Sequence, residues 1–148
     1  MQNHIDIRPF NRAIQSAVRD LILRGLSEHW GSIDESLNPD LSDIAEAYAS
    51  GHFVVAYIDR RLVGTGGFLP LSTVAIEIRR MSVDSKFRRR GVASSILENL
   101  ISHATERGYL CAKLETTAEW NQAISFYEQF GFSNLGVRKG EAHFEKNL

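Results

Sequence analysis

A run of three arginines stands directly before a helical pattern in this chain, at Arg88-Arg89-Arg90-Gly91. Apolar residues recur at four-residue steps after Gly91, which predicts a helix over residues 91–107 with one buried face. A helix N-terminus carries partial positive charge and unpaired N–H groups, so each exposed cation there is unfavourable by roughly 0.3–1 kcal/mol. No Ser, Thr, Asp or Asn immediately precedes Gly91 to accept hydrogen bonds from those groups. We therefore expect a bound anion to complete this turn.

The residues at the start of this helix are small, which suits a diphosphate that approaches the backbone closely. They are Gly91, Ala93, Ser94 and Ser95. In the alternative interpretation, Asp84 or Ser85 caps the helix earlier and the arginines form a solvated face. Gly91 would then lie inside the helix, at a cost of roughly 1 kcal/mol relative to Ala.

Length and composition narrow the class of protein. With 148 residues, the chain is expected to form a single domain over residues 1–148. The net charge of −1 argues against general nucleic-acid binding. The single cysteine, Cys111, excludes an intramolecular disulfide framework and a multi-cysteine zinc site, and we expect no metal and an inert, buried thiol. No apolar run of membrane-spanning length and no leader are seen, so a cytoplasmic protein without a membrane partner is expected.

The alternation of apolar and turn residues predicts the order β-α-α-β-β-β-α-β-α-β-β, without internal repeats or linkers. This order is typical of a mixed α/β sheet with helices on both faces. Strands are expected at residues 5–8, 53–58, 62–69, 73–83, 110–116, 132–137 and 142–145, and helices at residues 11–26, 40–49, 91–107 and 120–130.

The apolar residues of segment 73–83 change phase within one predicted strand. One parity carries Val74, Ile76 and Ile78, and the other carries Met81 and Val83. A β-bulge near Arg79 and Arg80 explains this change, because one extra residue reverses the face on which later side chains lie. A bulge also leaves backbone N–H and C=O groups without strand partners, so they can bind a ligand.

Three segments of the chain resemble the GNAT superfamily of acyl-coenzyme A-dependent N-acetyltransferases. The family signature, Gln or Arg, two residues, Gly, one residue, then Gly or Ala, is matched by residues 88–93. Residues 77–84 are similar to the family's central strand, and residues 123–132 to its last helix and the strand that follows. The resemblance spans about residues 51–146. It implies a GNAT-like fold, with a mixed, mostly antiparallel sheet of six or seven strands.

The resemblance also implies a function and a cofactor site. The expected reaction is transfer of an acetyl group from acetyl-CoA, as co-substrate, to a primary amine of a small molecule or peptide. The strand at residues 110–116 is implied to splay from its neighbour to admit the cofactor. The implied contacts are main-chain groups of Met81, Ser82 and Val83 for pantetheine, and Arg88, Arg89, Arg90, Gly91, Val92, Ala93 and Ser94 for the diphosphate. The alternative is a non-catalytic module that senses acyl-CoA.

Tyr127 is the candidate general acid, because the resembling family places a tyrosine there, near the coenzyme A sulfur. A phenol can donate a proton to a thiolate at short range. The alternative is a core tyrosine, since Ile124, Tyr127 and Phe130 share one helical face. Asn121 is a candidate cofactor contact, although the family's asparagine often stands seven residues before the tyrosine and Asn121 stands six before it. Its alternative role is to cap the helix.

Glu77 is the candidate general base. It lies on the predicted central strand, eleven positions before Arg88, and some members of the family carry a catalytic glutamate at that distance. Two alternatives remain: an ion pair with Arg79 on the same strand face, and proton relay through water.

The acceptor is expected to be an amine, with a cationic one favoured by an acidic segment. Residues 27–58 contain no Lys or Arg. The acidic residues in and beside this segment are Glu28, Asp34, Glu35, Asp40, Asp43, Glu46 and Asp59. In the resembling family this region borders the acceptor site, and such a rim attracts ammonium groups; a solvated surface is the alternative. His103 and His143 show no metal-ligand spacing. Exposed edge strands are compatible with a homodimer.

Overall fold

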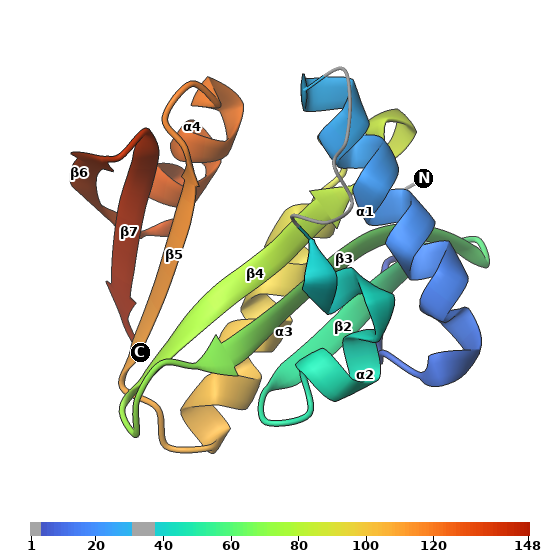
Figure 1. The fold of residues 1–148 in the computed structure, drawn as a ribbon, viewed down its shortest axis with the longest axis horizontal. Coiled ribbons are helices and arrows are strands. Elements are labelled where there is room, and N and C mark those ends of the chain that lie inside the picture. Colours follow the sequence, from blue (N-terminus) through green and yellow to red (C-terminus); the bar gives the residue numbers. More distant parts are fainter. Residues whose placement is uncertain (1–3, 31–37) are drawn as a thin grey trace.

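The fold is built on a seven-stranded mixed sheet. The computed structural model describes residues 4–30 and 38–148, and its strands lie in the order β1-β2-β3-β4-β5-β7-β6 (Figure 1). The strands are β1 (Asp6–Pro9), β2 (His52–Ile58), β3 (Arg61–Pro70), β4 (Ala75–Val83), β5 (Cys111–Thr117), β6 (Ser133–Arg138) and β7 (Glu141–Asn147). β4 and β5 are parallel, and the other neighbouring pairs are antiparallel. The expected mixed, mostly antiparallel sheet is confirmed.

Helices cover both faces of this sheet, as expected. They are α1 (Gln15–Trp30), α2 (Ile44–Ala47), α3 (Val92–Glu106) and α4 (Asn121–Phe130), with 3-10 turns at Arg12–Ile14, Pro39–Ser42 and Ser85–Phe87. α1 and α2 lie on one face of the β1–β4 half, whereas α3 and α4 share a core on the other face (Figure 1). Among the residues that the structure describes, no helix is long and apolar enough to cross a membrane.

The predicted helix at residues 40–49 is wrong in its extent. The segment holds the Pro39–Ser42 turn and the short α2 instead. Asp43 separates them because its backbone is not helical and its carboxylate accepts a hydrogen bond from the Glu46 N–H at 3.1 Å, which starts a new turn. The first predicted helix differs less: it begins with a 3-10 turn, and α1 continues to Trp30.

Glycines in β3 let α3 lie close to the sheet. A Cβ atom at Gly66 would stand 2.6 Å from Ile96 Cγ2, and one at Gly64 would stand 2.7 Å from Val92 Cγ1. Both distances are too short for carbon atoms in contact, so these positions need glycine for packing. The fully buried side chains of α3, including Ile96 and Leu100, then fix the helix over β3 and β4. This contact places the N-terminus of α3 beside the end of β4.

The bulge expected in β4 is present. Thr65 of β3 pairs with Ser82 while Gly67 pairs with Arg79, so β4 carries one more residue than β3 between these pairs. Arg80 has a φ of +57°, and its carbonyl accepts a hydrogen bond from the Thr65 hydroxyl at 2.8 Å. After this extra residue, Met81 returns to the core beneath α3. Val74 does not share that core: it precedes β4 and is half exposed.

Candidate functional site

β4 and β5 pair only at their N-terminal ends. The pairs are Ala75 with Cys111, Ile76 with Ala112 and Glu77 with Lys113. Beyond these pairs the strands diverge, as Figure 1 shows, although β4 runs on to Val83. The edge of β4 that faces β5 therefore has backbone N–H and C=O groups without a partner strand. The predicted splay of this strand from its neighbour is confirmed.

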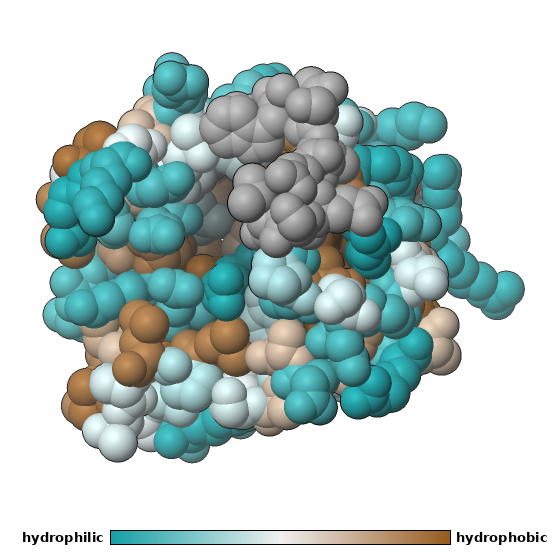
Figure 2. Space-filling model, in the orientation of Figure 1, coloured by the Kyte–Doolittle hydropathy of each residue, from teal (hydrophilic) through white to brown (hydrophobic). Residues whose placement is uncertain are grey.

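A cavity of about 970 Å³ lies between the diverging parts of β4 and β5, a region that we call the splay. Its walls come from β4, the start of α3, β5, α4 and α1, so segments far apart in the sequence meet there. In the space-filling view a hollow opens beside the grey atoms, between the surfaces of β4 and β5 (Figure 2). The predicted cofactor contacts Met81, Ser82 and Val83 line this cavity.

The N-terminus of α3 also lines the cavity and has no side-chain cap. Gly91 is the N-cap residue with a φ of +83°, a backbone conformation that favours glycine. Val92, Ala93 and Ser94 follow it along the cavity wall. Asp84 caps the separate 3-10 turn instead, by accepting a hydrogen bond from the Lys86 N–H at 2.9 Å. The alternative in which Asp84 or Ser85 starts the helix is thus wrong, and the first turn of α3 presents free N–H groups.

The three arginines differ in where they lie. Arg88 and Arg89 line the cavity, and Arg89 has a φ of +64°. The Arg88 guanidinium lies 3.4 Å from a Glu28 carboxylate oxygen, and both side chains are about half exposed. Arg90 is not among the cavity-lining residues, since its guanidinium lies over the Phe87 ring at 5.1 Å from the centroid. Within residues 4–30 and 38–148, Glu28 is the one carboxylate paired with this run, through a long, exposed contact that neutralises little charge.

Tyr127 is both a core residue and a cavity residue. It is buried, with its ring packed edge-on against Phe132 and close to Phe144. It also lines the cavity from α4. Burial raises the pKa of Tyr127 well above its usual range, so the phenol keeps its proton at neutral pH. The two interpretations of this residue are compatible, because the packed ring fixes where the hydroxyl lies.

Asn121 does not cap α4. The N-cap residue is Trp120, and no side-chain hydrogen bond caps the helix there. Asn121 is the first helical residue and lines the cavity, so the alternative of a capping role is wrong. Its contact with a cofactor stays a prediction.

Glu77 stands where β4 and β5 begin to diverge. Its carboxylate lies 3.4 Å from the Arg79 Nε atom and is about one third exposed. Glu77 is not among the residues that line the cavity. The ion pair foreseen as an alternative is therefore present, and the role of general base stays a prediction.

A buried network beside the bulge was not predicted. The Arg80 Nε and Nη2 atoms donate to the two Asp40 oxygens at 2.9 and 2.6 Å, and the Tyr48 hydroxyl donates to the same carboxylate at 3.0 Å. Burial alone would raise the pKa of Asp40, but the hydrogen bonds and charge of Arg80 outweigh it and lower the pKa. Arg80 and Asp40 stand forty positions apart, so no local pattern relates them.

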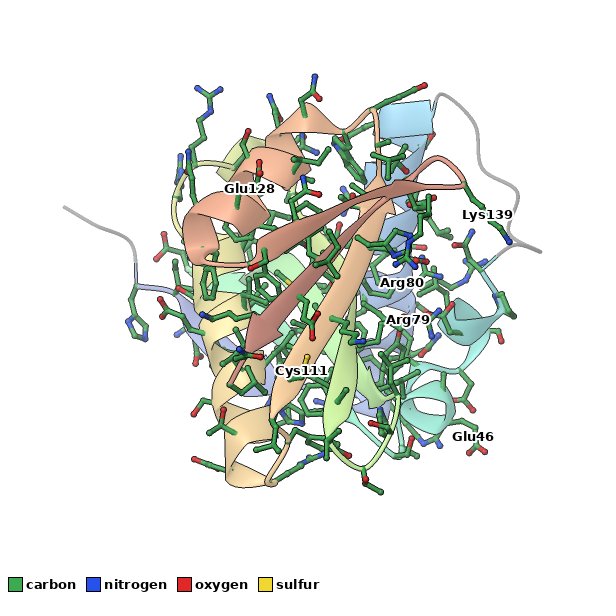
Figure 3. The ribbon with its side chains drawn as sticks, turned by 90° about the vertical axis from the view of Figure 1, so that its left-hand side faces the viewer. Glu46, Arg79, Arg80, Cys111, Glu128 and Lys139 are labelled. Carbon is green, nitrogen blue, oxygen red and sulfur yellow. The ribbon has the colours of Figure 1, made fainter. Side chains whose placement is uncertain are left out.

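The bulge sets the direction of Arg80, which without the extra residue would point to the face opposite to that of Arg79. Figure 3 shows Arg79 and Arg80 together on the side of β4 where α2 lies, although consecutive residues of a regular strand point to opposite faces. Both arginines line the cavity, but the side chain of Arg79 is 38% exposed and that of Arg80 is 16% exposed. The two arginines are thus neighbours with different surroundings.

Two acidic side chains line the cavity on the wall that faces β4. Glu115 of β5 and Glu141 of β7 both border it. A Glu115 carboxylate oxygen lies 3.6 Å from His143 Nδ1. No helix packs over these residues in the described part of the chain, because α4 covers the other face of β5 and β7.

Of the five acidic residues of the expected acceptor rim that the structure describes, three are paired with arginines. Glu28 pairs with Arg88, Asp40 with Arg80, and Asp43 with Arg12. Asp34 and Glu35 lie outside the described residues. The acidic wall of the cavity therefore comes from β5 and β7, which sequence reasoning did not single out.

The remaining candidates have structural surroundings. The Cys111 thiol donates to a Glu145 carboxylate oxygen at 3.1 Å, and burial together with that carboxylate raises the pKa of the thiol. The raised pKa agrees with an unreactive cysteine, but Cys111 is partly exposed and not buried as expected. Among the described residues, no group of three or more His, Cys, Asp or Glu is arranged to hold a metal ion.

Comparisons with known proteins agree on one family. Residues 16–132 match the family model described as Acetyltransferase (GNAT) family. Human N-acetyltransferase 8B is 30% identical over 112 residues, which make up 70% of this chain and 49% of that protein. The chain thus spans about half the length of the curated relatives of this type.

Solved structures share the fold across nearly the whole chain. An acetyltransferase of the GNAT family from Staphylococcus aureus Mu50 has a TM-score of 0.90 at 24% identity, covering 98% of this chain and 99% of that one. A GNAT family acetyltransferase from Elizabethkingia anophelis with acetyl-CoA bound has a TM-score of 0.75 at 18% identity, covering 97% and 98% of the two chains. At these identities the likeness concerns the fold.

Proposed function

The chain belongs to the acetyltransferase (GNAT) family, and on that premise we propose that it transfers an acetyl group from acetyl-CoA to a primary amine of a small molecule or peptide. The observation that carries the proposal is the uncapped N-terminus of α3 at the wall of the cavity between β4 and β5. The N-terminus of α3 is suited to bind an anion and lies beside the unpaired edge of β4. The cavity next to both has room for a second substrate.

The residues at one end of the cavity fit coenzyme A. Free N–H groups from Gly91 to Ser94 suit an anionic diphosphate, and Arg88 and Arg89 add positive charge beside them. The unpaired edge of β4 at Met81, Ser82 and Val83 suits the amides of the pantetheine arm, which can bind as an added strand does.

The reaction needs a neutral amine, oxyanion donors and a proton for the leaving thiolate. Acetyl-CoA supplies an activated acetyl group. The amine nitrogen attacks the carbonyl carbon, a C–N bond forms, and the C–S bond breaks. A lysine-type ammonium has a pKa near 10.4, so it must first lose a proton, and in this proposal Glu77 takes it; release of the proton to solvent through water molecules, without Glu77, is the alternative. Main-chain N–H groups at the β4 bulge are suited to the developing oxyanion.

Tyr127 is suited to protonate the thiolate. Its raised pKa keeps the phenol in the donor form at the pH at which amines are acetylated. Its position on the cavity wall between β5 and the start of α3 is compatible with a sulfur atom at the inner end of the pantetheine site.

The test is a thiol-release assay with acetyl-CoA and a panel of primary amines. We expect saturable release that depends on the amine, with the acetylated amine identified by mass spectrometry. Tight acetyl-CoA binding without turnover on any amine would favour the sensor alternative. Glu77→Gln separates the two routes for the amine proton: a direct base loses most turnover below the amine's pKa, whereas a water relay keeps it. Glu128→Gln on the exposed face of α4 is the matched control.

A further inference from the structure

The cavity has walls of opposite charge at the end away from the helix N-terminus. Arg79 stands on β4, next to the segment proposed to bind pantetheine. Glu115 and Glu141 stand on β5 and β7, across the splay. A single cationic acceptor would meet a guanidinium on one wall, and a single anionic acceptor would meet carboxylates on the other. Each arrangement places like charges together, which is unfavourable.

Arg79 has binding capacity that Arg80 lacks. Arg80 is nearly buried, and its guanidinium donates to both oxygens of Asp40. Arg79 is 38% exposed and, within the described part of the chain, its ion pair is a single contact from Nε to Glu77 at 3.4 Å. Among residues 4–30 and 38–148, no partner occupies the terminal nitrogens of Arg79, which lines the cavity. A guanidinium presents its donors as a planar fork that matches a carboxylate in two parallel hydrogen bonds.

We propose that the acceptor carries a carboxylate close to its amine, as an amino acid does, and that Arg79 binds this carboxylate. The inference rests on the proposed function and names its acceptor class. Glu115 and Glu141 hold the ammonium end of the acceptor across the splay. Arg79 is thus a specificity-determining residue, and its partner Glu77 restrains the guanidinium from the same strand face. This refines the expectation of an ammonium-bearing acceptor, because three of the five described acidic residues on which that expectation rested are paired with arginines.

The network of Arg80 prepares Arg79 for this role. Asp40 and Tyr48 hold Arg80 in place, so the backbone of the bulge next to Arg79 is fixed. Asp40 makes its hydrogen bonds with Arg80 and Tyr48 and none with Arg79, although the charge of Arg79 also contributes to the lowered pKa of Asp40. A fixed, partly desolvated guanidinium binds a carboxylate more strongly than a free one on the surface.

The experiment compares amino acids with their carboxamides, which keep the amine and the side chain but lack the negative charge. Values of kcat/KM are measured for wild type, Arg79→Gln and Arg79→Lys with acids and amides of several side chains. We expect wild type to prefer the acids by roughly 10- to 100-fold, the effect of a charge-assisted pair. Arg79→Gln should remove this preference through KM and leave acetyl-CoA affinity unchanged, while Arg79→Lys should restore part of it. Arg60→Gln, in the exposed turn after β2, is the control.

A second measurement does not need turnover. Binding of N-acetyl amino acids and of their carboxamides to the protein saturated with coenzyme A is followed by calorimetry. Preference for the acid in wild type and its loss in Arg79→Gln support the inference. Equal binding of acid and amide, or an acid preference that survives in Arg79→Gln, overturns it. Turnover confined to amines without a carboxylate also overturns it but leaves the proposed function standing. Absence of turnover on every amine removes the proposed function and the acceptor role with it, and the calorimetry then decides only whether Arg79 binds a carboxylate.

Discussion

The two ends of the cavity are built in different ways. The end proposed for the cofactor is formed by backbone: the edge of β4, the glycine turn at Gly91 and the first turn of α3. The end proposed for the acceptor is formed by side chains from separate strands, chiefly Arg79, Glu115 and Glu141. Backbone groups are the same for every residue type, so the first end can serve one common ligand. Charged side chains change by substitution, so the second end can be altered without rebuilding the first.

The strongest test of the backbone-built end is Gly91→Glu. A side chain at a φ of +83° strains the backbone, and a carboxylate there repels a diphosphate. We expect acetyl-CoA affinity to fall roughly 1,000-fold, or about 4 kcal/mol, chiefly through a like-charge penalty of several kcal/mol. Calorimetric titration measures it.

The matched control is Gly108→Glu. Gly108 has a φ of +89°, stands just beyond the other end of α3 and has open space around its Cα atom. It introduces the same strain and charge away from the cavity. Equal losses of affinity in both variants would show that strain, and not an anion site, explains the result.

The next largest effect is expected from Asp40→Asn, which disrupts the network beside the proposed acceptor end and should lower the free energy of unfolding. Removing one partner of a nearly buried ion pair leaves Arg80 uncompensated, and we expect a loss of about 3 kcal/mol in the free energy of unfolding. Urea denaturation measures it. Asp59→Asn is the control, since Asp59 is exposed in a hairpin turn at a φ of +49° that Asn tolerates. An unchanged stability would contradict the importance of this network.

Asp40→Asn should also change how the free energy of unfolding depends on pH. The pKa of Asp40 is lowered in the folded protein, so its contribution to stability is present above the ordinary aspartate pKa of about 4 and is lost as pH falls below that value. Wild type should therefore lose stability between pH 4 and the lowered pKa more steeply than Asp40→Asn. Parallel stability curves for the two proteins over that range would contradict this assignment.

Tyr127→Phe tests the junction between the two ends. The ring stays packed against Phe132 and Phe144, so we expect stability and acetyl-CoA affinity to change little. Loss of the proton donor should lower kcat by roughly 100-fold, near the lower limit for a general acid. Pre-steady-state thiol release measures the chemical step. Equal kcat values in the variant and wild type would limit Tyr127 to a role in the core.

The smallest effect is expected from Arg88→Gln. The Arg88 side chain is about half exposed and shares its charge with Glu28, so solvent screens much of its attraction for a diphosphate. We expect acetyl-CoA affinity to fall only about 5-fold, and less at high salt. A loss as large as that of Gly91→Glu would show that side chains, and not the backbone, dominate the cofactor end.

Much of the fold and the anion-site part of the proposed cofactor end followed from local pattern, whereas the pantetheine contacts and the splay of residues 110–116 followed from the family resemblance. The order of strands and helices came from periods of two and four residues, and the bulge came from a change of phase at residues 78–81. The start of α3 at Gly91 and the absence of a capping side chain were predicted from rules that relate adjacent residues. The extent of α2 did not follow, because Asp43 ends one turn and begins another through its own hydrogen bond.

The acceptor end was decided by the tertiary structure. Arg79 and Arg80 are identical in type, adjacent in sequence and both at the cavity, yet Asp40, forty positions from Arg80, accepts hydrogen bonds from Arg80 and none from Arg79. No sequence pattern marked Glu115 or Glu141 as site residues. The pairing of β5 with β7 places both at the cavity, across from Arg79. Periodicity and capping act over a few residues of one chain segment, so the sequence alone determined them. Which charge meets which depends on distances between segments, and only the folded chain sets those distances.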